Sequence, residues 1–130
     1  MAIGALIHAR ERMGNEIAMY LINELIDGYG VDEQITRLVD SREIFVLPML
    51  NPDGAEFDMS GGRFHAWRKN RQPNSGSSAI GTDLNRNWGY QWGNNNGSSS
   101  NPCQETYRGE SAFSEPETQA ISGVVNTLAG

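Results

Sequence analysis

The stretch AIGALIHARE, residues 2–11, determines which class of fold this sequence can adopt. Its first six residues, Ala2–Ile7, form a continuous apolar run, which is typical of a strand buried in a parallel sheet. His8 and Glu11 follow where the predicted strand ends and a helix begins. Because ligands of α/β sheets bind at the carboxyl ends of the strands, we expect both side chains to point into one cleft.

Two helices and a second strand are predicted next. Apolar pairs recur every fourth residue over 17–26, which indicates an amphipathic helix, and Gly28-Tyr29-Gly30 ends it. A shorter helix is expected over Asp32–Asp40. The apolar segment Ile44–Leu50 is expected to form a strand parallel to the first, with Pro48 interrupting its ladder. This order of elements predicts a βαβ unit and an α/β fold.

The second half of the chain is expected to be less regular. Asn51-Pro52-Asp53-Gly54 is a strong turn pattern. Residues 60–110 are expected to form a long loop with short ordered pieces, and such loops in compact domains commonly serve a functional site. Ser114-Glu115-Pro116-Glu117 matches a capping box and predicts a last helix that ends near Leu128.

Length and charge restrict the possible functions. The 130 residues suffice for one domain, expected to span residues 1–130. The formal net charge of −6 argues against a general nucleic-acid-binding protein. Six of the ten basic residues nevertheless lie between Arg63 and Arg108. This local concentration of positive charge indicates a site for a small anion or a carboxylate.

Cysteine and hydropathy patterns restrict the cellular setting. Cys103 is the only cysteine, so no disulfide can form within the chain. No apolar run approaches the roughly 20 residues that a membrane helix needs, and no membrane partner is expected. Met1–Ile7 is too short for a signal peptide and lacks basic residues.

His8 and Glu11 are the first candidates for chemistry. Imidazole and carboxylate are both good zinc ligands, and a spacing of three residues across one turn can bring them onto one metal ion. The alternative is structural, because a glutamate near a helix N-terminus is favourable without any metal.

The basic segment Trp67-Arg68-Lys69-Asn70-Arg71 is the second candidate. A guanidinium held there could donate to a developing oxyanion. One alternative is a solvated basic loop. Another is phosphate or nucleic-acid binding with Trp67 as a stacking platform, which the acidic net charge disfavours.

The third candidate is the segment Gly81–Trp88. Asn85 and Arg86 offer adjacent donors that suit a carboxylate, which arginine can bind through two hydrogen bonds. Asp83 could instead orient a metal-bound histidine through the second ring nitrogen. The alternative is local turn chemistry, which Asp and Asn favour.

Five motifs occur in order along nearly the whole chain, and together they resemble the family of zinc carboxypeptidases that includes the pancreatic carboxypeptidases A and B. The loop at residues 71–78 is most similar to the bacterial carboxypeptidase T branch. The motifs are His8-Ala9-Arg10-Glu11, Asn51-Pro52-Asp53-Gly54, Trp67-Arg68-Lys69-Asn70-Arg71, Asp83-Leu84-Asn85-Arg86-Asn87, and Tyr107-Arg108-Gly109 with Ser114-Glu115-Pro116-Glu117.

The resemblance implies an α/β fold with a partial mixed, largely parallel sheet and flanking helices, truncated at both ends. It also implies a zinc site and a reaction. His8 and Glu11 correspond to two of three zinc ligands, and Asp83 to a partner that orients His8. The implied enzyme is a zinc-dependent exopeptidase, a secreted hydrolase that removes the C-terminal residue of peptides and proteins.

The resemblance also implies how a substrate binds. Arg68 would stabilise the oxyanion of the tetrahedral intermediate. Asn85 and Arg86 would hold the C-terminal carboxylate of the substrate. Arg10 would line the cleft toward the N-terminal side of the substrate.

Other parts of the family's site are not matched in this sequence. The third zinc ligand, the general-base glutamate and a tyrosine that closes over substrate belong to later segments, so the sequence is expected to be a piece of a longer domain, with Met1-Ala2 an artificial start. His65 is expected to lie on the rim and not to bind metal. An alternative function is an inactive remnant or a module that binds peptide C-termini through Asn85 and Arg86.

Overall fold

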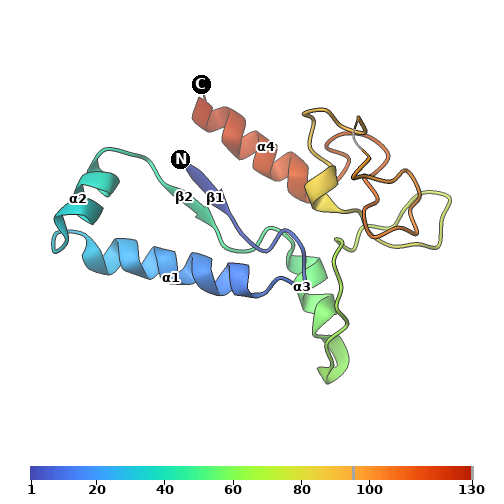
Figure 1. Cartoon of the computed structure of the whole chain (residues 1–130), viewed down its shortest axis with the longest axis horizontal. Helices are drawn as coiled ribbons and strands as arrows, with labels where there is room; N and C mark the ends of the chain where they lie inside the picture. The colour runs from blue at the N-terminus through green and yellow to red at the C-terminus, as the bar shows by residue number, and fades with distance from the viewer. Residues whose placement is uncertain (95, 130) are drawn as a thin grey trace. The chain divides into compact units, whose positions relative to one another are not determined.

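The computed structural model describes residues 1–94 and 96–129. The chain divides into two compact units (Figure 1). Unit 1 consists of Met1–Leu6 and Glu11–Leu50, and unit 2 consists of Ile7–Arg10 and Asn51–Gly130. The two strands of the sheet belong to unit 1, and the long irregular segment belongs to unit 2.

Unit 1 is a strand–helix–helix–strand arrangement. Its elements are β1 (Ala2–Gly4), α1 (Met13–Gly28), α2 (Glu33–Asp40) and β2 (Phe45–Leu47). The two strands pair in parallel, with Ile3 opposite Val46. Figure 1 shows them side by side. The predicted α/β class and the parallel pairing are thus confirmed.

Both strands are shorter than predicted, at three residues each. Beyond Gly4 the pairing continues through Ala5, whose amide donates to Leu47 O at 2.9 Å and whose carbonyl accepts from Leu50 N at 3.0 Å. Pro48 has no amide hydrogen to add to the ladder. Leu6 takes the left-handed conformation, with φ of 55°, which ends the first strand.

The helices of unit 1 follow the predicted apolar pattern. α2 begins after Asp32, whose side chain accepts hydrogen bonds from the amides of Gln34 and Ile35. The last residue of α1 is Gly28, and a Cβ there would lie 2.4 Å from Ile35 Cδ1. Glycine therefore allows α2 to pack closely against the end of α1.

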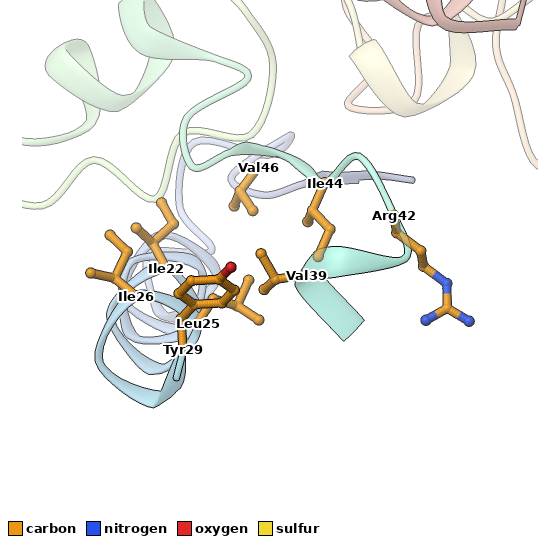
Figure 2. A pocket seen from close by; sticks show the side chains of 8 residues that line it. All are labelled: Ile22, Leu25, Ile26, Tyr29, Val39, Arg42, Ile44 and Val46. Atoms are coloured by element: carbon orange, nitrogen blue, oxygen red, sulfur yellow. The ribbon is translucent and has the colours of Figure 1, made fainter. Parts of the chain in front are cut away.

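An open apolar pocket of about 520 Å³ lies between the helices and β2 (Figure 2). Side chains of α1, α2 and β2 face it, so the three elements share one apolar layer. This layer is thin, because Ala18 is the one residue of α1 that is buried and α2 buries none. The residues that line the pocket are Ile22, Leu25, Ile26, Tyr29, Val39, Arg42, Ile44 and Val46.

The longer segment of unit 2 begins with a helix where a turn was predicted. α3 spans Pro52–Asp58, and the Asn51 side chain accepts a hydrogen bond from Gly54 N at its start. The turn prediction was wrong because Asn and Pro also suit the N-cap and the first turn of a helix. A Cβ at Gly54 would lie 2.7 Å from Lys69 O, so the helix start also packs against the basic segment.

Residues 60–110 are largely irregular, as predicted. The described part of this stretch contains two short 3-10 helices, Ser60–Gly62 and Leu84–Arg86. Buried asparagine side chains satisfy its backbone groups where no strand does so. Asn87 is fully buried and its Nδ2 donates to Arg108 O at 2.9 Å and to Ser111 O at 3.0 Å. The core of unit 2 is therefore mainly polar.

The last helix, α4 (Pro116–Ala129), begins where the capping pattern predicted. The reciprocal bonds of a capping box are absent from the described residues, however. The Ser114 hydroxyl instead donates to Glu115 Oε1 at 2.7 Å, and Glu117 Oε2 accepts from Asn70 Nδ2 at 3.1 Å. Among the described residues, no helix has the length and apolar character needed to cross a membrane.

Candidate functional site

The carboxylate of Asp83 is the centre of the candidate site. Asp83 is fully buried and caps the 3-10 helix that follows it, accepting a hydrogen bond from Asn85 N at 3.0 Å. Its Oδ1 lies 3.0 Å from His8 Nε2. Its Oδ2 accepts from Arg68 Nε at 3.2 Å and from Arg68 Nη2 at 2.9 Å. Asp83 thus brings together two other residues that the sequence singled out.

The charge of Asp83 determines which role His8 Nε2 plays in their hydrogen bond. Burial alone would raise the pKa of Asp83, but hydrogen bonds from His8 and Arg68 and the charge of Arg68 outweigh it and lower the pKa. The carboxylate is therefore ionised at neutral pH and can only accept hydrogen bonds. His8 Nε2 is then the donor of the hydrogen bond to Asp83, and a metal ion would bind the other ring nitrogen, Nδ1. An imidazole oriented by a carboxylate in this way fits a zinc ligand.

Arg68 keeps part of its guanidinium available. Nε and Nη2 both donate to Asp83, and the side chain is only 14% exposed. Within residues 1–94 and 96–129, Nη1 makes no hydrogen bond. The ion pair therefore orients the guanidinium and leaves one nitrogen for a further acceptor.

Buried hydrogen bonds hold the segments that carry these side chains. Ala9 N donates to Arg68 O at 3.2 Å. The fully buried Asn51 donates through Nδ2 to Ile7 O at 3.2 Å and to Lys69 O at 3.1 Å. The segments that carry His8 and Arg68 are thus tied to the same amide.

The backbone before Arg68 adopts an unusual conformation. Ala66 has φ of 56°, in the left-handed region that residues other than glycine seldom enter. The Arg10 side chain donates to Ala66 O at 3.2 Å, and Trp67 N donates to Asp58 Oδ1 at 2.6 Å. Strained backbone of this kind commonly positions functional side chains.

The Trp67 ring takes part in internal packing. Its Nε1 donates to Asn70 O at 3.1 Å, and the Phe57 ring meets it edge to face at 5.1 Å. The Arg71 guanidinium lies 3.6 Å from the Phe57 centroid and 4.7 Å from the Trp67 centroid. Lys69 is also turned inward, where its Nζ donates to Pro102 O at 2.8 Å and burial lowers its pKa. These contacts disfavour the solvated basic loop and a stacking platform for bases.

Asn85 and Arg86 belong to the 3-10 helix that Asp83 caps. Arg86 Nε donates to Gly97 O at 2.7 Å, and Nη1 donates to Asn85 O at 3.1 Å. Both residues line a small cavity of about 90 Å³, together with Trp88, Tyr90, Gln91, Trp92, Gly93 and Ser98. The structure thus places the two donors at a cavity that can accept a group of carboxylate size.

Glu11 and His65 are the remaining candidates for metal binding. Glu11 belongs to unit 1 and is exposed before α1, so its pairing with His8 stays a prediction from their spacing. His65 lies 4.7 Å from Phe57, centroid to centroid, and its Nε2 is 3.1 Å from Ser60 O. Within the described part of the chain, no cluster of three or more His, Cys, Asp or Glu side chains is arranged to hold a metal ion.

The chain is similar to proteins of one known family. Residues 1–129 match the protein family described as zinc carboxypeptidase. The chain belongs to this family. The resemblance inferred from the five motifs is thereby confirmed, and zinc is the metal of the family.

Individual relatives support the same assignment over part of their length. The zinc carboxypeptidase of Saccharothrix mutabilis subsp. capreolus is 56% identical over 87 residues, which are 67% of this chain and 20% of that protein. Carboxypeptidase A2 of Mus musculus is 43% identical over 115 residues, 88% of this chain and 27% of that protein.

Solved structures are similar as well. The crystal structure of thrombin activatable fibrinolysis inhibitor matches with a TM-score of 0.91 and 32% identity, covering 99% of this chain and 32% of that one. Carboxypeptidase A of Helicoverpa armigera matches with a TM-score of 0.82 and 36% identity, covering 95% of this chain and 29% of that one. The chain thus spans between 20% and 32% of the length of these four proteins.

Some residues around the candidate site were not predicted. Asn51 was interpreted as a turn residue, although it organises the backbone under His8. Glu105, whose Oε2 lies 3.2 Å from Arg10 Nη1, carries no local signal because its partner is 95 residues away. Asp58 was missed as well, because its bond from Trp67 N depends on the path of the irregular segment that follows α3.

Proposed function

We propose that this chain supplies part of the active site of a zinc-dependent exopeptidase that hydrolyses the C-terminal peptide bond of peptides and proteins. The observation that carries the proposal is the buried carboxylate of Asp83, which holds both His8 and Arg68. One carboxylate then orients an imidazole for a metal ion and a guanidinium for a developing negative charge. Membership of the zinc carboxypeptidase family supports the same reaction.

In this proposal His8 and Glu11 bind zinc. His8 binds through Nδ1, because Nε2 donates to Asp83. Glu11 would bind through its carboxylate, an assignment that rests on its spacing from His8. When bound, zinc polarises the scissile carbonyl and activates water. Asp83 keeps the ring oriented and makes Nδ1 a better electron donor.

The arginines and Asn85 are proposed to bind the substrate. Arg68 Nη1 would donate to the oxyanion that develops at the scissile carbonyl. Asn85 and Arg86 would hold the C-terminal carboxylate, which restricts cleavage to the end of a chain. Arg10 would contact the substrate toward its N-terminal side. Its present bonds, to Ala66 O and Glu105, already place it beside the Arg68 segment.

Residues 1–130 are proposed to be one part of a catalytic domain, and by family resemblance the enzyme is proposed to be secreted. The sequence assigns two zinc ligands, whereas a catalytic zinc usually has three protein ligands and one open position. We therefore expect the isolated 130-residue chain to bind zinc loosely and to lose it to a mild chelator. We also expect its peptidase rate to be far below ordinary enzymatic turnover.

Zinc titration of the purified chain, followed by isothermal calorimetry, tests the metal assignment. His8→Ala and Glu11→Gln should each weaken zinc binding by about tenfold or more, whereas the matched control His65→Ala should leave it unchanged. Loss of zinc affinity in His65→Ala would overturn the ligand assignment.

Peptides with a free C-terminal carboxylate and the same peptides with a C-terminal amide test the reaction. Chelator-sensitive release of the last residue from the free acid alone supports an exopeptidase, and release at ordinary turnover would show that His65 or a second chain completes the site. Carboxylate-dependent binding without hydrolysis, unaffected by zinc, would favour the module that binds peptide C-termini.

A further inference from the structure

The cavity beside Asn85 and Arg86 contains a buried hydroxyl that no hydrogen bond satisfies. Ser98 lines this cavity, and its Oγ is buried without a partner among the described residues. A buried hydroxyl in a folded protein normally has a partner, either protein or water. The Ser98 hydroxyl can therefore donate to a molecule bound in the cavity.

The backbone holds Ser98 in place from both sides. On one side, Gly97 O accepts the 2.7 Å hydrogen bond from Arg86 Nε. On the other side, Ser99 N donates to Thr106 O at 2.9 Å, and Ser99 O accepts from Arg108 N at 3.0 Å. The same Arg86 that lines the cavity thus fixes the residue before Ser98, so the hydroxyl and the guanidinium are positioned together.

The donors around the cavity suit an anion with two oxygens. Arg86 uses Nε and Nη1 for backbone carbonyls, and within residues 1–94 and 96–129 its Nη2 makes no hydrogen bond. Arg86 forms no ion pair, and the Asn85 side chain makes no hydrogen bond, within the same residues. No acidic side chain lines the cavity, so the guanidinium charge is not neutralised there.

The size of the cavity limits its occupant. A volume of about 90 Å³ suffices for a carboxylate or for a few water molecules. Because the cavity combines a cation, an amide and a hydroxyl donor, a carboxylate satisfies more of its groups than water does.

We propose that Ser98 is a further substrate-binding residue, whose hydroxyl donates to the C-terminal carboxylate that Asn85 and Arg86 hold. This inference rests on the proposed exopeptidase function, because it takes the substrate's carboxylate as the ligand. Ser98 would thus take a direct part in recognising the C-terminus of the substrate.

Binding of a fluorescent peptide, measured by anisotropy, tests this role. Ser98→Ala should weaken binding of the free-acid peptide by about tenfold, because a hydrogen bond to a charged group is lost. The matched control Ser100→Ala, an exposed neighbour, should bind like wild type. Binding of the C-terminal amide should be weak and equal in all three proteins, and acetate should compete less well than the peptide.

Thermal unfolding separates this role from a structural one. Without peptide, Ser98→Ala should melt no lower than wild type, because the hydroxyl has no protein partner to lose. With peptide, it should gain less stability than wild type. Unchanged peptide affinity in Ser98→Ala, together with a loss in Arg86→Ala, would show that water satisfies Ser98 and would overturn this inference alone. Unchanged affinity in Arg86→Ala would instead overturn the proposed carboxylate site.

Discussion

His8 Nε2 and Asp83 Oδ1 lie 3.0 Å apart although 75 residues separate them in the chain. Neither side chain is accessible, since Asp83 is fully buried and His8 is 5% exposed. The contact therefore sets the orientation and the tautomer of the one buried histidine of unit 2, and through it the chemistry of the proposed metal site.

Replacing this carboxylate should weaken zinc binding. Asp83→Asn removes the charge that keeps the proton on His8 Nε2, so we expect zinc affinity to fall about 10- to 100-fold. Competition with a chromogenic chelator measures the affinity. Asp53→Asn, at an exposed position of α3, is the control and should bind zinc normally. Equal affinity in both variants would remove Asp83 from the metal site.

Arg68 and Arg86 should affect different kinetic constants. In an active form of the enzyme, Arg68→Ala should lower kcat by roughly 100-fold or more, because its Nη1 would contact the oxyanion only as the reaction proceeds. Arg86→Ala should mainly raise KM, because a carboxylate is held equally before and during the reaction. Arg63→Ala, at an exposed position, should change neither constant. Mild and equal effects of the first two substitutions would reject these roles.

Releasing the strain at Ala66 should stabilise the fold. Its φ of 56° disfavours any residue with a Cβ, so Ala66→Gly should raise the free energy of unfolding by about 1 kcal/mol. Urea denaturation measures the change. Ala79→Gly is the matched control and should lower stability, because Ala79 is not in the left-handed region and glycine only adds chain entropy there. A loss of stability in both variants would show that Ala66 is not strained.

The acidic group at the start of α4 should make stability depend on pH. Burial, together with the charges of Glu115 and Asp53, raises the pKa of Glu117 despite the hydrogen bond from Asn70. A raised folded-state pKa contributes stability below the unfolded-state pKa, and this contribution is lost as pH rises through the folded-state pKa.

Glu117→Gln should consequently be more stable than wild type at neutral pH. The difference should vanish below about pH 4, where the wild-type carboxyl is protonated in both states. Thermal unfolding across this range is the measurement. Glu56→Gln, at an exposed position of α3, should show no such crossover. A Glu117→Gln variant that is less stable at pH 7 would contradict the raised pKa.

Removing the Asn51 side chain should destabilise unit 2. Asn51→Ala loses the cap of α3 and leaves the buried carbonyls of Ile7 and Lys69 without their donor, which we expect to cost about 3 kcal/mol. Guanidinium denaturation measures this cost. Asn23→Ala, at an exposed position of α1, should change stability by less than about 0.5 kcal/mol.

Local sequence determined the elements of unit 1 and the identity of the candidate residues. An apolar run predicts a strand, and a period of four predicts a helix, because each signal depends on neighbouring residues alone. The parallel pairing followed, since two helices between two strands favour a crossover connection. The motifs around His8, Arg68 and Asp83 were recognisable by their order, which needs no coordinates.

Only the tertiary structure decided how these residues interact. The contact of Asp83 with His8 and Arg68, and the orphan hydroxyl of Ser98, depend on irregular segments that side-chain amides such as Asn51 hold together. Such long-range polar contacts have no periodicity along the chain. Asparagine, moreover, is found in turns, at helix caps and at buried positions where its side chain binds backbone groups. Which of these an asparagine adopts depends on the backbone groups that the rest of the fold leaves unsatisfied.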